Sequence, residues 1–321
     1  MHRATGVRLR HAAVAVSGFA LLAACGGSAG PTPTPSPVAN DQLSQILARG
    51  TLVISSDPAY PPQSFAIDGA TRTAGTRCAS NQLTAAELDG YDVQTAIEVA
   101  QRLGVEPCFV TPSWTEVTGG SWGDRWDLSI GSMDISRERM DALWFAQPYY
   151  ATPNVAWVNV AESRFSTPTD LSGMKVGACL DCTQYAYLDG TLDLPGETVE
   201  FLIEDARIVG YDVEAPGIED LAAANGNVDG FLSSASVGEA AIAEGKAIKA
   251  LGDPLYYAYS APAVDKSSGK SAAAFVAKLD EIIAAMHTDG TLATLSQTAF
   301  GTDYAAQAAT FDVTALGQTI P

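Results

Sequence analysis

The stretch DLSIGSMDISRERM, from Asp127 to Met140, joins the end of a strand to the start of a helix. Its first four residues have the apolar character of a short buried strand. Ser136 is placed to cap the helix that follows, because a serine side chain accepts a hydrogen bond from a free N–H of the first helical turn. The stretch also puts Asp134 only five residues before Arg139. What this acid does so close to a base is the question that the sequence raises.

Strand and helix patterns alternate on both sides of this stretch. Residues 51–54 and 108–110 have strand patterns, and between them apolar residues at positions 93, 96, 97 and 100 recur with the period of a helix that Gly104 would end. Further expected strands are 155–158, 175–178, 207–209 and 228–232, and further expected helices are 237–243, 275–286 and 291–300. This alternation predicts an α/β fold with a second sheet in the second half of the chain.

The N-terminus has the pattern of a signal peptide over residues 1–24. Three arginines precede an apolar run at positions 12–24, which is too short to span a bilayer. The run ends in LAAC, which is similar to a bacterial lipobox, so we expect Cys25 to carry lipid as the first mature residue. Ordinary cleavage nearby, leaving a free Cys25, is the alternative. Residues 25–40 are rich in Pro, Thr, Ser and Gly and are expected to form an extended tether.

The remaining chain is strongly acidic. Residues 1–24 hold three of the 18 Lys and Arg residues and none of the 37 Asp and Glu residues, so the mature chain has 15 basic against 37 acidic residues, a formal charge of −22. A nucleic acid is therefore not expected as a partner. The same negative charge mildly favours cationic ligands, although such a charge more commonly serves only to keep a protein soluble.

Four cysteines remain after Cys25, which in an oxidising compartment implies two disulfides. We expect Cys78 to pair with Cys108, closing a loop worth roughly 3–4 kcal/mol, and Cys179 to pair with Cys182, closing a loop worth only about 2 kcal/mol. The second bond would mainly shape its loop. Redox chemistry or zinc binding at this CxxC motif are the alternatives, but the mature chain has one histidine, His287, and no second CxxC motif.

Six segments resemble the extracytoplasmic solute-binding proteins of the polar-amino-acid type, the receptors of ABC importers. In chain order they are GTLVISSDPAYPPQSF, GYDVQTAIEVAQRLGV, DLSIGSMDISRERMDALWFAQPYY, LSGMKVGA, GNVDGFLSS and MHTDGTLATLSQTAFG, and together they cover nearly all of residues 45–301. The resemblance implies a type II periplasmic-binding-protein fold, in which two α/β lobes close on a ligand around a two-strand hinge. It implies lobe 1 at 41–152 and 259–321, lobe 2 at 153–258, and chain crossings near 150–153 and 255–260.

In this family an arginine in the first turn of a lobe 1 helix binds the carboxylate of the ligand as a bidentate pair. Arg139 matches that anchor, and Gly131, Ser132, Met133 and Asp134 line its approach. A surface ion pair with a neighbouring acid of the same helix is the alternative for the arginine.

The resemblance also implies contacts with the rest of the ligand. Asp57 and Tyr60 follow the first strand, where the family contacts the ligand side chain, and Trp114 matches a wall of that pocket. Thr183 matches a residue that completes the carboxylate shell from lobe 2. The alternatives are a turn cap for Asp57, packing for Tyr60 and Trp114, and a plain helix cap for Thr183. Two other tryptophans, at positions 122 and 126, are interpreted as packing residues.

Two residues depart from the family pattern. Asp134 stands where relatives commonly place Ser or Thr, and two like charges about 4 Å apart would repel by about 4 kcal/mol at an effective dielectric constant near 20. Ser234 stands where the family usually has an Asp for the ligand ammonium. Our hypothesis is that the ammonium partner has moved to Asp134. The alternatives are that Asp134 turns away to pair with Arg139, or that the ligand is not a standard α-amino acid.

The expected function is that of a lipid-anchored, extracytoplasmic and monomeric receptor that delivers an amino acid to an ABC permease. No cofactor or metal is expected. An enzyme similar to cyclohexadienyl dehydratases is one alternative, but it needs a poised general acid, for which the sequence offers only Asp57 and Asp134. A sensory domain is another alternative, although such a domain is usually fused to a transmembrane helix and a kinase.

Overall fold

The computed structural model describes residues 40–321. The expected signal peptide, Cys25 and all but the last residue of the expected tether lie outside these residues. Within the described part of the chain, no helix has the length and apolar character that crossing a membrane requires.

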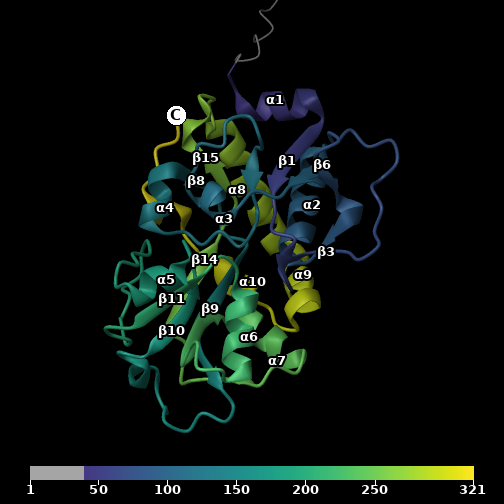
Figure 1. The fold of residues 1–321 in the computed structure, drawn as a ribbon. Coiled ribbons are helices and arrows are strands. Elements are labelled where there is room, and N and C mark those ends of the chain that lie inside the picture. The colour runs from purple at the N-terminus through teal and green to yellow at the C-terminus, as the bar shows by residue number, and fades with distance from the viewer. Residues whose placement is uncertain (1–39) are drawn as a thin grey trace, which may run out of the picture. The chain divides into compact units, whose positions relative to one another are not determined.

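The first sheet has six strands, all of which fall within the residues expected to form lobe 1. In spatial order they are β4 (Leu83–Thr84), β6 (Glu106–Val110), β1 (Thr51–Ser55), β7 (Leu128–Ser129), β15 (Ala263–Asp265) and β8 (Leu143–Phe145). The central strand β1 runs parallel to β6 and β7 and is buried along its whole length. Figure 1 shows this sheet and its helices in the upper half of the view.

Apolar helix faces cover this sheet. The helices of lobe 1 are α1 (Gln42–Arg49), α2 (Tyr91–Leu103), α3 (Trp114–Thr118), α4 (Arg137–Ala142), α8 (Ala273–Thr288), α9 (Thr291–Phe300) and α10 (Ala305–Ala308). The apolar period predicted for α2 is buried in the core, and the helix ends at Gly104, which adopts the left-handed conformation (φ 75°) that glycine tolerates best. A small sheet of β2 (Ala59–Tyr60), β3 (Ser64–Ala66) and β5 (Leu88–Asp89) lies beside α2.

The second sheet belongs to lobe 2. Its strands are β11 (Arg207–Tyr211), β10 (Lys175–Cys179), β12 (Gly230–Ser234), β9 (Tyr150–Asn159) and β13 (Ile248–Ala250), and β14 (Tyr256–Ser260) pairs with β9. Its helices are α5 (Thr183–Leu188), α6 (Glu214–Ala223) and α7 (Ala235–Ala243). Two sheets with flanking helices make this the two-lobed α/β fold that the resemblance implies.

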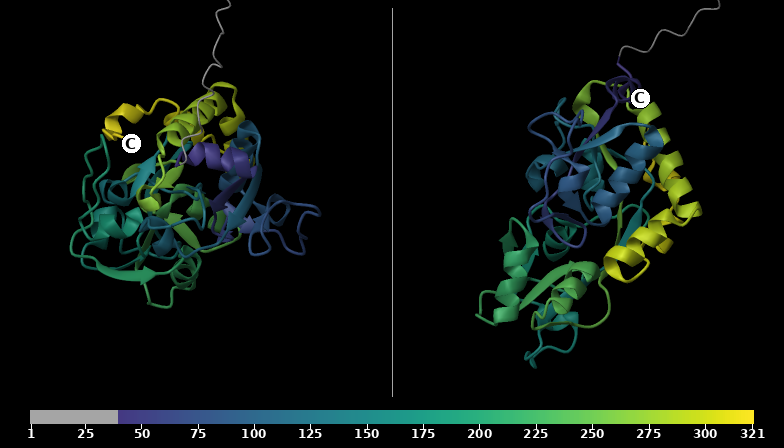
Figure 2. Two further views of the ribbon diagram at one scale, coloured as in Figure 1. Left: turned by 90° about the horizontal axis from the view of Figure 1, so that it is seen from above. Right: turned by 90° about the vertical axis from the view of Figure 1, so that its right-hand side faces the viewer.

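The two lobes are joined by the paired strands β9 and β14. These run antiparallel from the pair Tyr150 and Ser260 to the pair Asn154 and Tyr256. The C-terminal segment also reaches lobe 2, since the Tyr304 hydroxyl donates to a Glu239 carboxylate oxygen at 3.0 Å. Figure 2 shows this yellow segment running beside lobe 1 toward lobe 2 in its right-hand view.

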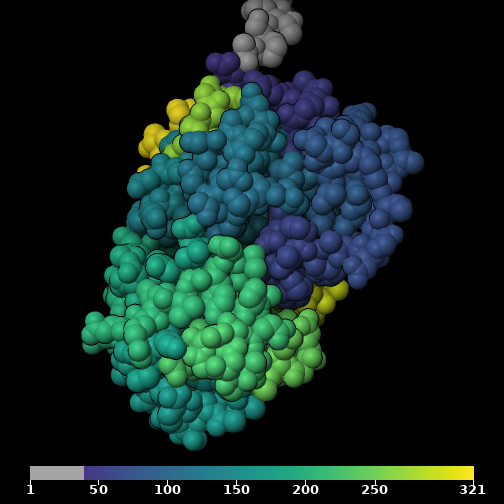
Figure 3. All heavy atoms as spheres, viewed as in Figure 1, coloured from purple at the N-terminus to yellow at the C-terminus, as the bar shows by residue number. Residues whose placement is uncertain are grey.

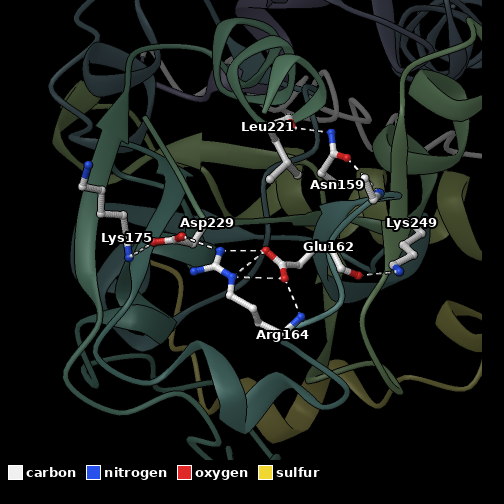
Figure 4. A network of polar contacts seen from close by, with 8 residues as sticks. Asn159, Glu162, Arg164, Lys175, Leu221, Asp229 and Lys249 are labelled. Carbon is white, nitrogen blue, oxygen red and sulfur yellow. Dashed lines mark hydrogen bonds and ion pairs between the residues drawn. The ribbon is translucent and has the colours of Figure 1, made fainter. Parts of the chain in front are cut away.

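Disulfides and polar contacts fasten the long loops of each lobe. Cys78 is bonded to Cys108 with a Cα–Cα distance of 5.4 Å, which ties the excursion before β4 to the central sheet of lobe 1. In lobe 2 the Arg164 guanidinium bridges Glu162 and Asp229 (Figure 4). Because the Arg164 side chain is 59% exposed, water screens this bridge, and its main effect is to orient the loop that follows β9.

Candidate functional site

A cavity of about 90 Å³ lies between the two lobes. Many of its lining residues follow the carboxyl ends of parallel strands, where ligand sites of open α/β sheets form. Lobe 1 contributes Ser55, Ser56, Asp57, Tyr60, Pro112, Trp114, Val117, Ser129, Gly131, Ser132, Asp134 and Arg139. Lobe 2 contributes Cys179, Cys182, Thr183, Gln184, Asp212, Val213 and Glu214.

Most of the residues that the sequence suggests for ligand contact line this cavity, and two do not. Those that line it are Asp57, Tyr60, Trp114, Gly131, Ser132, Asp134, Arg139 and Thr183. Met133 does not line it, because its fully buried side chain packs into a lobe 1 core cluster together with Trp122 and Trp126. Ser234 is not among its lining residues either: its buried hydroxyl lies 3.0 Å from the Ser236 hydroxyl and beside Tyr60, at the contact between the lobes.

Arg139 is a buried cation without an acidic partner. The Ser136 hydroxyl caps helix α4 by accepting from the Arg139 backbone N–H, which sets the arginine in the first turn. Its Nη1 donates to the Asp134 carbonyl at 2.9 Å and its Nη2 to the Asp181 carbonyl at 2.8 Å, while the guanidinium lies 5.2 Å from the centre of the Trp114 ring. The side chain forms no ion pair with any residue from 40 to 321, and Nε has no hydrogen-bond acceptor there. The remaining donors can therefore bind an anion in the cavity.

The Asp134 carboxylate joins the lobes instead of pairing with Arg139. One of its oxygens accepts from the Ser260 hydroxyl at 2.7 Å, and the other accepts from the Thr183 hydroxyl of lobe 2 at 2.9 Å. Arg139 binds the backbone carbonyl of Asp134 and forms no ion pair with its side chain. The carboxylate therefore stays beside the guanidinium while remaining free to accept from a cation in the cavity.

The loop between Cys179 and Cys182 is a second contact between the lobes. Its disulfide spans a Cα–Cα distance of 5.5 Å, and Asp181 within it has a positive φ of 57°. The Asp181 carbonyl accepts from Arg139 and from the Trp114 indole N–H at 3.2 Å, and its carboxylate accepts from the Thr115 hydroxyl at 2.6 Å. One short loop of lobe 2 thus holds three side chains of lobe 1, and Figure 3 shows the atoms of the two lobes in contact.

A buried acid supports the corner at Ser132. Asp92, which the sequence did not single out, is fully buried and accepts from the Ser132 hydroxyl at 2.7 Å and the Tyr149 hydroxyl at 2.8 Å. Burial raises the pKa of Asp92 to about 7. Ser132 itself has a positive φ of 53°, and the Tyr150 hydroxyl donates to it at 2.6 Å. This network fixes the backbone of the cavity wall next to Arg139.

Glu214 is a further cavity acid that the sequence did not single out. It begins α6, is 5% exposed, and accepts from the Ser233 hydroxyl at 2.6 Å. Burial, together with the nearby Asp134, raises the pKa of Glu214 to about 7. The only signal for it in the sequence is an acid in the segment that follows the expected strand 207–209. Three serines of the cavity wall also have buried hydroxyls without a partner in the described residues: Ser55, Ser56 and Ser129.

The histidine and the acids of the described residues do not form a metal site. Across residues 40–321, no three His, Cys, Asp or Glu side chains are grouped closely enough to hold a metal ion. His287 lies away from the cavity, with its Nε2 2.8 Å from the Pro148 carbonyl. The cavity therefore offers one guanidinium, several carboxylates and several hydroxyls to a ligand.

Comparisons with known proteins agree with this geometry. The family described as bacterial extracellular solute-binding proteins, family 3, matches residues 52–302. The L-cystine-binding protein TcyJ of Escherichia coli K12 is 27% identical over 265 residues, covering 81% of this chain and 86% of that protein. The ABC transporter arginine-binding protein 1 of the same organism is 24% identical over 214 residues, covering 65% of this chain and 81% of that protein.

Solved structures share the fold. An ancestral amino acid-binding protein, AncCDT-1, described as a precursor of cyclohexadienyl dehydratase, aligns with a TM-score of 0.65 at 19% identity, over 81% of this chain and all of that chain. Holo ArgBP from T. maritima aligns with a TM-score of 0.60 at 20% identity, over 76% of this chain and 93% of that chain. At these identities the likeness concerns the fold alone.

Proposed function

The chain belongs to family 3 of the bacterial extracellular solute-binding proteins, and from this membership we propose that it captures a polar amino acid and delivers it to an ABC permease. The names of its relatives, which bind cystine and arginine, support an amino acid as ligand. The family is extracytoplasmic, and lipidation at Cys25 would keep this monomeric receptor at the membrane that holds the permease.

Arg139 is the observation that carries the proposal. Holding a buried guanidinium without an anion is costly, so a cavity that exposes its free donors is complementary to a ligand carboxylate. A carboxylate bound there would also lie near Ser132 and Thr183, whose hydroxyls already donate to Asp92 and Asp134. Asp57, Tyr60 and Trp114 would then surround the ligand side chain.

The ammonium group of the ligand is assigned to Asp134. Ser234, at the position where the family usually has this acid, is neutral, and its hydroxyl lies 3.0 Å from the Ser236 hydroxyl. Asp134 is an acid next to Arg139, which suits an α-ammonium bonded to the same Cα as the α-carboxylate. The hydroxyls of Ser260 and Thr183 hold its oxygens in place.

Ligand binding would favour the closed arrangement of the lobes. Residues of both lobes line the cavity, so a ligand gains contacts when the lobes meet, and this difference shifts the population toward the closed form. Hydrogen bonds between the lobes also stabilise the closed form. They join Asp134 to Thr183, Arg139 to Asp181, and Gln63 to Ser236 at 2.8 Å. The permease would then recognise the closed form.

Isothermal titration calorimetry with the twenty common amino acids and L-cystine tests the proposed function. We expect the protein, with residues 1–24 removed and Cys25 replaced by Ser, to bind at least one of them with a dissociation constant of about 10 μM or tighter, a binding free energy of about −7 kcal/mol. If none of these compounds binds at millimolar concentration, the proposal fails.

Opening the Cys179–Cys182 disulfide should weaken binding. The Cys179→Ser, Cys182→Ser double variant is expected to bind the same amino acid about tenfold less tightly, because the loop that carries Asp181 must then be ordered during closure. Calorimetry on the folded variant measures this change.

The other disulfide supplies the matched control. Opening Cys78–Cys108 should lower the free energy of unfolding by roughly 3–4 kcal/mol, since it closes a loop of about 30 residues, without changing the affinity of the folded protein. Equal affinities for the Cys179–Cys182 variant and the parent would show that this loop has no part in closure.

One observation favours a second candidate function, an enzyme that uses a general acid. Glu214 is a buried carboxyl group in the cavity whose pKa is raised by burial to about 7, a value suited to proton transfer near neutral pH. Incubation with prephenate and with arogenate tests this function directly. Turnover that disappears in a Glu214→Gln variant would replace the receptor by an enzyme, whereas unchanged substrate after prolonged incubation supports binding alone.

A further inference from the structure

We infer that Glu214 binds a second cationic group of the ligand, so that the cavity selects amino acids with a positively charged side chain. This inference rests on the proposed function and adds the ligand class and the residue that determines it. The family position for a lobe 2 acid, Ser234, is not acidic in this chain, and Glu214 lies on a different element of the same lobe.

Glu214 is buried, and only one of its two carboxylate oxygens accepts a hydrogen bond. One carboxylate oxygen, Oε2, accepts from the Ser233 hydroxyl at 2.6 Å, whereas Oε1 accepts no hydrogen bond from any residue in the described range. No Lys, Arg or His of residues 40–321 forms an ion pair with it. Since Glu214 is 5% exposed and lines the cavity, its free oxygen is available to a group bound inside the cavity.

When Asp134 and Glu214 are ionised, the charges of these two acids and Arg139 sum to −1, which a ligand with net charge +1 would neutralise. Arg139 contributes one positive charge, and the buried acids Asp134 and Glu214 would contribute two negative charges when ionised. A neutral amino acid pairs its carboxylate with Arg139 and its ammonium with Asp134, which leaves Glu214 unpaired. A ligand with a second cationic group would pair with Glu214 as well. Asp57 and Asp212 also line the cavity and add further negative charge near it.

The electrostatics around Glu214 agree with this assignment. Burial raises the pKa of Tyr60 well above its ordinary value, and the nearby charges of Glu214 and Asp134 add to this increase. Tyr60, Asp134 and Glu214 all line the cavity, with Tyr60 on its lobe 1 side. A cation placed between Tyr60 and Glu214 would occupy the part of the cavity assigned to the ligand side chain.

Matched pairs of ligands distinguish the proposed role of Glu214, which binds the side-chain cation, from that of Asp134, which binds the α-ammonium. L-arginine and L-citrulline have nearly the same shape, but only arginine carries the side-chain cation; L-lysine and L-norleucine form a second such pair. 5-Guanidinopentanoate keeps the side chain and carboxylate of arginine and lacks its α-ammonium. In calorimetry the parent protein should bind L-arginine or L-lysine at least about tenfold more tightly than its neutral counterpart.

Glu214→Gln should remove this preference. We expect the variant to lose about 100-fold in affinity for the basic amino acid while its affinity for L-citrulline or L-norleucine stays within about threefold. Glu219→Gln is the control, because Glu219 lies on the same helix, is exposed and pairs with Lys246. That variant should bind every ligand as the parent does.

The pH dependence of unfolding gives a readout in the absence of ligand. A carboxyl group with a raised pKa stays protonated in the folded state while it ionises in the unfolded state, so stability falls as the pH rises from about 4.5 to 7. Asp92 acts in the same direction. Glu214→Gln should therefore melt at a higher temperature than the parent at pH 8, with a difference that disappears near pH 4.

Three results would overturn the inference. The first is equal affinity of the parent for arginine and citrulline and for lysine and norleucine. The second is a Glu214→Gln variant that loses basic and neutral ligands alike, which would make Glu214 a structural residue. The third is a variant that loses neither. As long as the parent binds at least one amino acid, each of these results leaves the proposed function standing; if no amino acid binds at all, the proposed function fails instead.

Discussion

Replacing Arg139 by lysine is expected to reduce amino acid affinity about 1000-fold, a loss of about 4 kcal/mol. A lysine ammonium cannot offer two parallel N–H donors to a carboxylate, and it cannot at the same time reach the carbonyls of Asp134 and Asp181. Calorimetry with the amino acid found in the panel measures the loss.

Two controls make the Arg139 result specific. Arg137→Lys changes the first residue of the same helix, whose side chain does not line the cavity, and should bind as the parent does. Arg139→Met should bind nothing yet melt no lower than the parent without ligand, because removing a buried charge without an acidic partner is not costly. Binding by the Arg139→Lys variant within about threefold of the parent would contradict the carboxylate assignment.

Asp134→Asn is expected to lower affinity for α-amino acids about 100-fold. The amide keeps an acceptor for the Ser260 hydroxyl and a group that can donate to Thr183, so the contact between the lobes survives while the charge is lost. The affinity for 5-guanidinopentanoate, which has no α-ammonium, should fall much less than the affinity for L-arginine.

The control for Asp134→Asn is Asp141→Asn, an exposed acid on the neighbouring helix α4. If the Asp134→Asn variant binds α-amino acids as tightly as the parent, the ammonium is held elsewhere. In that case Asp134 serves only to join the lobes through Thr183.

The fold follows closely from local patterns in the sequence. The apolar period of α2 and its stop at Gly104 identify a helix between the strands β1 and β6, and the structure pairs these strands in parallel. Pattern alone does not give the short strand β7, which the sequence suggests as four residues and which pairs over two. Such ends depend on the neighbouring strands and not on the segment itself.

The site was only partly predictable, for physical reasons. Residues that come soon after strands, such as Asp57 after β1 and Thr183 at the start of α5, could be predicted to lie at the cavity because the segments at the carboxyl ends of strands meet there. Met133 was included with its neighbours Ser132 and Asp134, but its apolar side chain turns into the core, where burial stabilises it.

Glu214 shows what sequence patterns miss. An acid at the start of a helix is usually interpreted as a partner of the helix dipole on the surface. Here the fold brings this helix start against Ser233 on the neighbouring strand and opposite Tyr60 of the other lobe, and this arrangement depends on residues far apart in the chain. No local pattern contains that information.

A crystal structure of the protein with its amino acid bound tests the central claim most directly. The account predicts the ligand carboxylate within hydrogen-bond distance, about 3 Å, of the Arg139 guanidinium, with lobe 2 residues contacting the same molecule. A ligand bound at another place, with the Arg139 guanidinium still held only by the carbonyls of Asp134 and Asp181, would contradict it.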